Sequence, residues 1–203
     1  MDNPTSEHKK NIIAAAEQWL PYISLKFEFV EGVEGDIRIA TEGVVNSSFL
    51  GTDALDIFPD SPTMNLGIDP EHEDFETVVI HEFGHALGAM HEHQHPKAQI
   101  PWNKENVYNY YQNRPLNPLS RNEVDDNIFT PFDDADALYL PYDRQSIMHH
   151  PISNSLTLGN WENPTNREIS EKDGREAEIG DEGGDQARLR QPHAEEGRAE
   201  RTH

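Results

Sequence analysis

The chain has 203 residues, 34% of them hydrophobic and 27% charged, with a formal net charge of −22 and no cysteine. This length suffices for one domain with a core, followed by a tail. The charge argues against a nucleic-acid partner, because phosphate contacts need clusters of Lys and Arg. The lack of cysteine excludes disulfides, and no apolar run approaches the roughly 18 residues that a membrane span requires.

The beginning of the chain predicts a helix and no export signal. Residues 3–20 place apolar side chains on one face at helical spacing, with Asn3 as the cap and Pro21 as the terminator. The apolar stretch in this helix, IIAAA, is followed at once by Glu17 and is too short for a signal peptide. If Met1 is the true start, this predicts a cytoplasmic protein.

Three short strands are predicted next. Residues 25–30 (LKFEFV) and 36–40 (DIRIA) alternate apolar and polar side chains, as half-buried strands do. Residues 63–67 (TMNLG) form a third candidate, bounded by Pro62 and Gly67.

The second half of the chain predicts fewer regular elements. An apolar stripe over residues 74–88 indicates a helix with a core face and a separate polar face. A short helix is expected over 103–112, whereas 113–145 is rich in Asn, Asp and Pro and is expected to be a loop. Ser170 and Asp173 form a capping box that would open one more short helix.

The composition changes towards the C-terminus. Residues 181–203 carry many charges and no aromatic side chain. They bury too little apolar surface to offset the entropy of ordering. We therefore expect one folded domain over residues 1–180 and a charged, disordered tail over 181–203.

The stretch HEFGHALGAMHEH, residues 81–93, is the strongest motif of the chain. His81 and His85 are four residues apart, so a helix places both imidazoles on one face, within reach of one ion. Gly88 can end that helix and turn the chain back, because glycine tolerates positive φ. His91 then arrives as a third ligand, which leaves the fourth position of a tetrahedral zinc site for water. The spacing predicts one catalytic Zn²⁺ held by His81, His85 and His91.

Glu82 supplies the second element of the chemistry. It cannot usefully ligate the ion from a position beside His81, but it can act as a general base towards zinc-bound water, whose pKa zinc brings near 7. It would then pass the proton to the leaving amine of a peptide. A solvated or core helix that merely contains histidine is the alternative interpretation. His93 and His95 have no such spacing and are expected to be exposed loop residues.

A methionine downstream completes the pattern. Residues 142–151 read YDRQSIMHHP, and a tight turn at Ser146–Met148 would place the Met148 side chain as a hydrophobic floor under the zinc. The zinc motif followed by such a Met-turn is the metzincin signature. Without that motif upstream, a core methionine would be the default interpretation.

The stretches HEFGHALGAMHEHQHP and YDRQSIMHH resemble the astacin family of metzincin proteases, especially its fungal and bacterial relatives. DIRIA, SFLGTDA, TMNLG and IPWNKENVYNYY follow the same order, so the resemblance covers roughly residues 10–175. It implies a zinc-dependent metalloendopeptidase of α+β class. The zincin-like catalytic domain would contain a twisted mixed sheet with an edge strand, two long helices and a small C-terminal subdomain with the Met-turn.

The resemblance also implies partners. Protein or peptide substrates would bind extended along Thr63–Gly67 as the edge strand, and we expect a monomer that binds neither nucleic acid nor membranes. Family members are extracellular, in contrast to the compartment that the N-terminus predicts. Glu92 matches a family glutamate that binds the processed N-terminus.

One departure from the family concerns the catalytic machinery. Astacins read SxMHY, with a tyrosine that stabilises the oxyanion, and here that position is His150. Its imidazole could donate a hydrogen bond or ligate the ion, so His150 joins Glu82 as a catalytic candidate. Two other hypotheses stay open: a zinc-binding interaction module that has lost useful catalysis, and a metal-buffering protein that binds several ions.

Overall fold

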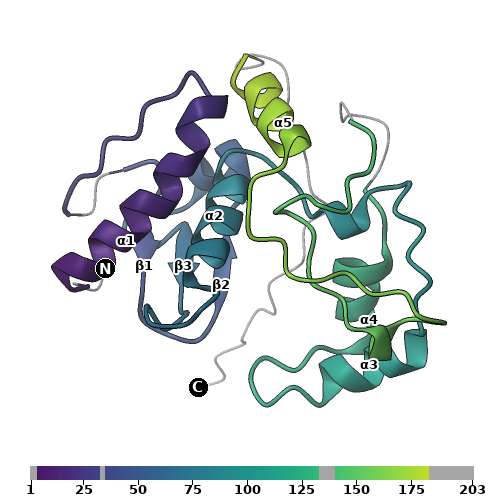
Figure 1. Ribbon diagram of the computed structural model, residues 1–203. Coiled ribbons are helices and arrows are strands. Elements are labelled where there is room, and N and C mark those ends of the chain that lie inside the picture. Colours follow the sequence, from purple (N-terminus) through teal and green to yellow (C-terminus); the bar gives the residue numbers. More distant parts are fainter. Residues whose placement is uncertain (1–3, 33–34, 133–139, 183–203) are drawn as a thin grey trace.

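The computed structural model describes residues 4–32, 35–132 and 140–182. Figure 1 shows the first helices and the sheet gathered in one half of the molecule, and α3 and α4 in the other. The mixture of helices with a small mixed sheet confirms the α+β prediction. No helix in these described ranges is long and apolar enough to cross a membrane.

The sheet has three strands in the order β1-β3-β2, formed by Ile39–Ala40, Met64–Leu66 and Asn46–Ser48 respectively. β3 runs parallel to β1, with Ile39 opposite Met64, and antiparallel to β2, with Ser48 opposite Met64. The prediction that Thr63–Gly67 is the edge strand is therefore wrong, because its strand is hydrogen-bonded on both sides. Its fully buried Met64 and Leu66 suit a central position.

The strand predicted over residues 25–30 is also wrong. This segment has no regular structure and pairs with no described strand. Phe27 alone packs inward, edge-on against Phe83 with ring centroids 5.6 Å apart. Leu25 and Phe29 lie on the surface. Alternating apolar and polar residues are typical of a half-buried strand, but the pattern does not supply a neighbouring strand for hydrogen bonding.

The N-terminal α-helix begins later and ends earlier than predicted, and a 3₁₀ turn follows it directly. α1 spans Ser6–Ala16 and is capped by Thr5, whose hydroxyl accepts a hydrogen bond from the His8 amide; Asn3 lies outside the described residues. Helical structure continues as the 3₁₀ turn η1 (Glu17–Tyr22), which contains Pro21. The fully buried Trp19 in η1 donates its indole N–H to the Ile80 carbonyl, 2.9 Å away, and so joins this end to the next helix.

That next helix, α2 (Phe75–Ala86), lies where the prediction placed it. It packs against α1, β2, β3 and the 3₁₀ turn η2 (Gly51–Asp56). The buried core around it draws on α1, η1, β3, α2 and later segments of the chain, and consists of Ile12, Ala15, Ala16, Trp19, Met64, Leu66, Phe75, Val79, Ile80, Phe83, Ile147, Met148 and Ala177.

Short helices and helical turns form the other half of the molecule. α3 (Lys104–Gln112) confirms the helix predicted there. The region expected to be loop contains α4 (Arg121–Val124), opened by a Ser120 capping box, and the π-helical turn η4 (Asp125–Phe129). Short 3₁₀ turns, η3 (Glu92–Gln94) and η5 (Asn154–Leu156), complete this half.

The last helix, α5 (Glu171–Glu182), confirms the capping box. The Ser170 amide donates to Asp173 Oδ2 at 2.8 Å, and the Asp173 amide donates to Ser170 Oγ at 3.1 Å. α5 packs on η1, where Gly174 leaves room for the Tyr22 ring. The helix runs two residues past the expected boundary at 180, and the remainder of the expected tail, residues 183–203, lies outside the described residues.

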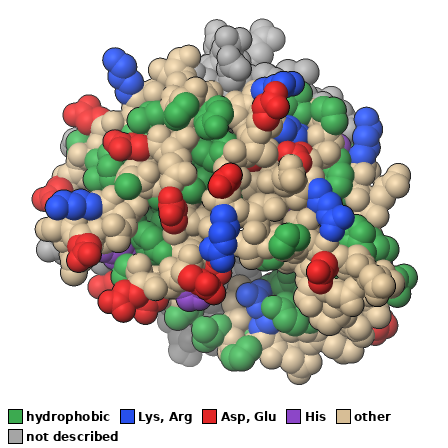
Figure 2. Space-filling view, viewed as in Figure 1, with side chains coloured by type: hydrophobic (Ala, Val, Ile, Leu, Met, Phe, Trp, Pro, Cys, Tyr) green, Lys and Arg blue, Asp and Glu red, His purple; other side chains and the backbone are tan. Residues whose placement is uncertain are grey.

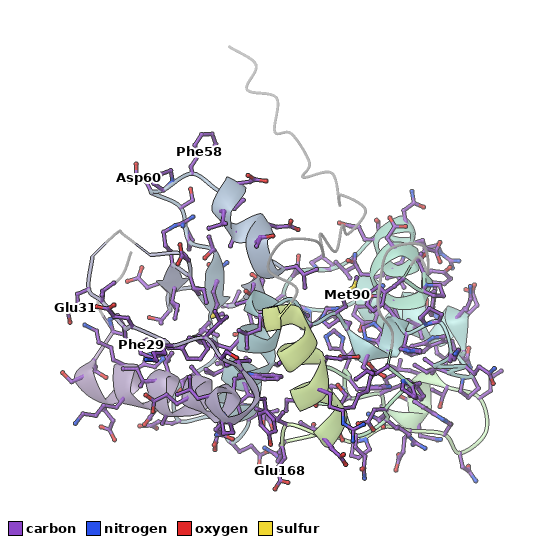
Figure 3. All side chains as sticks on the ribbon, turned by 90° about the horizontal axis from the view of Figure 1, so that it is seen from above. Phe29, Glu31, Phe58, Asp60, Met90 and Glu168 are labelled. Carbon is purple, nitrogen blue, oxygen red and sulfur yellow. The ribbon has the colours of Figure 1, made fainter. Side chains whose placement is uncertain are left out.

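The acidic character of the chain is visible on the surface. Figure 2 shows Asp and Glu side chains spread over one face, with isolated Lys and Arg among them and no basic cluster on that face. Figure 3 shows Phe58 and Asp60 at the tip of a loop; the Phe58 side chain is among the most exposed apolar groups.

Candidate metal centre

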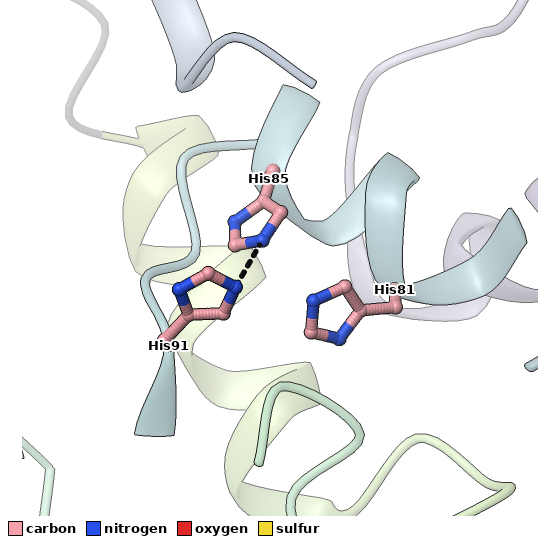
Figure 4. A group of neighbouring side chains, drawn as sticks. All are labelled: His81, His85 and His91. Atoms are coloured by element: carbon pink, nitrogen blue, oxygen red, sulfur yellow. Dashed lines mark hydrogen bonds between the residues drawn. The ribbon is translucent and has the colours of Figure 1, made fainter. Parts of the chain in front are cut away.

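The three histidines predicted to bind zinc lie together (Figure 4). His81 and His85 project from α2 with ring centroids 4.7 Å apart, and the His91 ring lies 4.5 Å from that of His85. The Nε2 atoms of His85 and His91 are 3.0 Å apart. One nitrogen from each of the three rings can be chosen so that all lie within 4.8 Å of one another.

Hydrogen bonds on the far sides of two rings orient them. His81 Nδ1 lies 2.9 Å from the Ile147 carbonyl oxygen, and His85 Nδ1 lies 2.8 Å from that of Ala89. A carbonyl oxygen only accepts, so each Nδ1 donates and each Nε2 keeps a free lone pair. This arrangement is typical of metal-binding histidines.

Burial keeps these rings neutral, as metal ligation requires. It lowers the pKa of His85 to about 3, assisted by the neighbouring His81 ring. It lowers the pKa of His81 and of His91 as well. Two tetrahedral zinc ligands at about 2.05 Å from the ion lie roughly 3.3 Å apart. The separation of the His85 and His91 nitrogens is close to this value, so the residues fit a zinc ion.

Gly88 lies at the turn between the second and third histidines. Its φ is +98°, in the left-handed region that other residues rarely adopt. Its amide donates to the His85 carbonyl at 2.8 Å, and the Ala89 amide donates to Gly84 at 2.9 Å, which ends α2. The chain then turns back and brings His91 to the other two rings.

Glu82 lies next to His81 and is almost completely buried, with 6% of its surface exposed. Its Oε2 atom has no hydrogen-bond partner among the described residues. Burial raises the pKa of this carboxyl to about 8. A buried carboxyl oxygen without a donor, in the residue that follows the first histidine, suits a group that exchanges protons during a reaction.

Met148 packs against α2 at Gly84, which lies between His81 and His85 in the chain. It is 1% exposed, and a Cβ atom at Gly84 would lie 2.5 Å from its sulfur and 3.1 Å from Trp19 Cζ2. Because Gly84 has no side chain, Met148 can approach the helix backbone here. That Met148 forms a hydrophobic floor under a bound ion stays a prediction.

His150 lies inside the histidine cluster. Its ring centroid is 4.2 Å from that of His91, 5.5 Å from that of His81 and 4.6 Å from that of His93, with which it stacks. Burial is the largest cause that lowers the pKa of His150 well below its usual value. His91, His93 and His150 form a second group whose candidate ligand atoms lie within 4.8 Å of one another.

The expectation that His93 and His95 are exposed is wrong. They are 4% and 5% exposed. His93 Nε2 lies 3.2 Å from the Asn127 carbonyl, and His95 Nε2 lies 2.9 Å from the Leu140 carbonyl. Both partners belong to the region expected to be loop, so nothing in the local spacing could have indicated this burial.

Sequence reasoning also missed the polar groups of α5 that face this region. Lys172 Nζ lies 2.5 Å from Glu92 Oε2. The cation that Glu92 contacts is therefore a lysine side chain, whereas the family resemblance implies the processed N-terminus. The Asp173 carboxylate accepts hydrogen bonds from Ser146 Oγ at 2.5 Å and from the Ile147 amide at 2.9 Å. The capping box explained Asp173 only as a helix start.

Comparison with known proteins agrees with this geometry. The family model for astacin, which describes a peptidase family, matches residues 1–183. A solved structure of myroilysin is similar at 40% identity with a TM-score of 0.80, covering 87% of each chain. High choriolytic enzyme 1, a hatching enzyme zinc-protease from the medaka fish Oryzias latipes, shares the fold at 18% identity with a TM-score of 0.60, covering 87% of this chain and 84% of that one. A search of curated proteins found no match.

The fold and the converging imidazoles define a zinc-dependent peptidase. The chain belongs to the astacin family of peptidases, as the match over most of its length shows.

Proposed function

We propose that the protein is a metalloendopeptidase whose single catalytic zinc is held by His81, His85 and His91. The observation that carries the proposal is the convergence of these three imidazoles, together with the buried and unpartnered Oε2 atom of Glu82, which follows His81 on α2. When bound, zinc polarises a carbonyl as a Lewis acid and lowers the pKa of water to about 7.

Residues of the protein carry out the remaining steps and support the site. Glu82 Oε2 accepts a proton from the attacking water and returns it to the leaving amine nitrogen. His150, whose ring lies against that of His91, donates a hydrogen bond to the developing oxyanion in place of the family tyrosine. Met148 and Gly88 support the site: the first packs under α2, and the second forms the turn that delivers His91.

Substrates of this site are extended polypeptides. β2 (Asn46–Ser48) is an edge strand of the described sheet, and it also contacts α2, which carries the histidines. An extended peptide can add to such an edge by main-chain hydrogen bonds. We therefore assign substrate pairing to β2 in place of the central strand β3.

The test compares Glu82→Gln with Glu76→Gln. Both substitutions remove one carboxylate from α2, but Glu76 is exposed on the first turn. Glu82→Gln should keep zinc and fold but lower hydrolysis of an unselective protein substrate by roughly 10²–10⁴-fold. Glu76→Gln should match the wild type.

Two results would contradict the proposal. Near-wild-type turnover by Glu82→Gln would show that Glu82 is not the base. A wild-type protein that binds zinc yet hydrolyses nothing would favour an interaction module.

A further inference from the structure

The first turn of α5 presents two adjacent charged side chains to the metal centre. Asp173 is buried, with 2% of its surface exposed, and only 9% of the Lys172 side chain is exposed. Burying a charge is costly unless partners compensate it. Their partners therefore indicate what the two residues do.

Asp173 is connected to the first metal ligand through one residue, Ile147. Its carboxylate accepts hydrogen bonds from Ser146 Oγ (2.5 Å) and the Ile147 amide (2.9 Å). The carbonyl of Ile147 in turn accepts the hydrogen bond from His81 Nδ1 (2.9 Å). A displacement of this backbone would turn the His81 ring and its free Nε2 atom.

Lys172 is connected to the third ligand through Glu92, which directly follows His91 in the chain. Lys172 Nζ lies 2.5 Å from Glu92 Oε2 and 3.0 Å from Glu176 Oε1. Glu92 Oε1 accepts a hydrogen bond from the Asp143 amide at 2.6 Å. The Glu92 amide donates to the Met148 carbonyl at 3.0 Å, so the segment after His91 is held from several directions.

We propose that Lys172 and Asp173 are positioning residues of the metal centre: Asp173 fixes the carbonyl that orients His81, and Lys172 fixes the residue that follows His91. α5 thus sets the relative placement of two ligands from different segments of the chain. The proposal rests on the zinc site proposed above.

The exposure of the charged residues of α5 distinguishes a positioning role from ordinary stabilisation of the helix. Arg175 forms an ion pair with Glu171 on the same helix, but its side chain is 62% exposed and that of Glu171 is 83% exposed. Removing the Arg175 charge should therefore change little. Arg175→Met is the matched control for Lys172→Met, because both replace one cation of α5 by the same residue.

The experiment measures how fast the zinc-loaded protein releases its ion to a chelator, for the wild type, Lys172→Met, Lys172→Arg, Asp173→Asn and Arg175→Met. Far-UV circular dichroism verifies that each variant is folded under the same conditions. Loss of a group that orients a ligand typically weakens metal binding by about 10–100-fold. Lys172→Met and Asp173→Asn should therefore release zinc faster by that factor. Lys172→Arg keeps the charge, so its rate of zinc release should stay close to that of the wild type. Arg175→Met should release zinc at the wild-type rate.

A second readout reports ligand geometry directly. The visible spectrum of the Co²⁺-substituted protein should change in Lys172→Met and Asp173→Asn but not in Arg175→Met. If Asp173→Asn does not fold, the comparison of Lys172→Met with Lys172→Arg decides. Unchanged release and spectra in folded Lys172→Met would overturn the inference while the zinc site stands. A wild type that binds no zinc would instead overturn the proposed function.

Discussion

Replacing Gly84 by alanine should destabilise the protein, although alanine favours helices. The substitution gains about 1 kcal/mol of helix propensity. The new Cβ atom, however, would meet Met148 Sδ at 2.5 Å and Trp19 Cζ2 at 3.1 Å. These two side chains are 1% and 0% exposed, so neither can move into solvent. Such overpacking costs about 1–3 kcal/mol, which leaves a net loss of roughly 0–2 kcal/mol.

Gly174→Ala is the matched comparison, because it makes the same change within α5. Its Cβ atom would lie 2.3 Å from Tyr22 Cδ1, but Tyr22 is 37% exposed, so its side chain has room to shift towards solvent, unlike the buried Met148 and Trp19. Gly84→Ala should therefore melt about 2–12 °C below Gly174→Ala, the range that corresponds to about 1–3 kcal/mol in a protein of this size.

The assay is thermal unfolding followed by circular dichroism, run on the metal-free proteins so that zinc binding does not shift the midpoint. If the melting temperature of Gly84→Ala is equal to or above that of Gly174→Ala, Met148 does not pack as closely against α2 as the structure indicates.

Three further outcomes are expected. Burial lowers the pKa of His85 and of His93 to about 3, so the unfolded chain takes up protons below pH 6.5 that the folded chain does not. Each of the two should lower the free energy of unfolding of the metal-free protein, measured with urea, by about 1.4 kcal/mol per pH unit as the pH drops below 6.5. The carboxyls of Glu82 and Glu92, whose pKa values burial raises to about 8 and about 7, act in the opposite direction until the unfolded chain protonates them near pH 4.5. The free energy of unfolding should therefore fall below about pH 4.5, and a flat profile there would contradict this. His91→Ala should lose most of its zinc on dialysis, while the exposed His72→Ala keeps it; equal metal content would remove His91 from the ligand set. His150→Tyr should raise turnover and His150→Ala should lower it, and wild-type rates in both variants would make His150 a bystander.

The convergence of the three histidines could be predicted because their spacing is local. His81, Gly88 and His91 lie within eleven residues, and helix periodicity followed by a glycine turn determines where their side chains meet. The same holds for the Ser170–Asp173 capping box, which is formed by neighbours in the chain. Geometry of this kind follows from the backbone alone.

Other features depend on partners that are distant in sequence. Lys172 meets Glu92 across 80 positions, and nothing near either residue indicates the other. His93 is buried by η4, a turn in a region whose Asn and Asp content indicates a loop.

Whether a strand lies at the edge of the sheet also depends on distant residues, because it depends on which other strands it pairs with. Thr63–Gly67 was correctly predicted as a strand, but its own residues do not show that it has neighbours on both sides.

The most direct test is a zinc titration of the metal-free protein in which peptide hydrolysis is measured after each addition. We expect activity to rise linearly and to reach its plateau at one zinc per chain, while Glu82→Gln binds the same single ion and stays inactive throughout. A plateau at two or more ions per chain, or activity that does not depend on zinc, would contradict a single catalytic ion held by His81, His85 and His91.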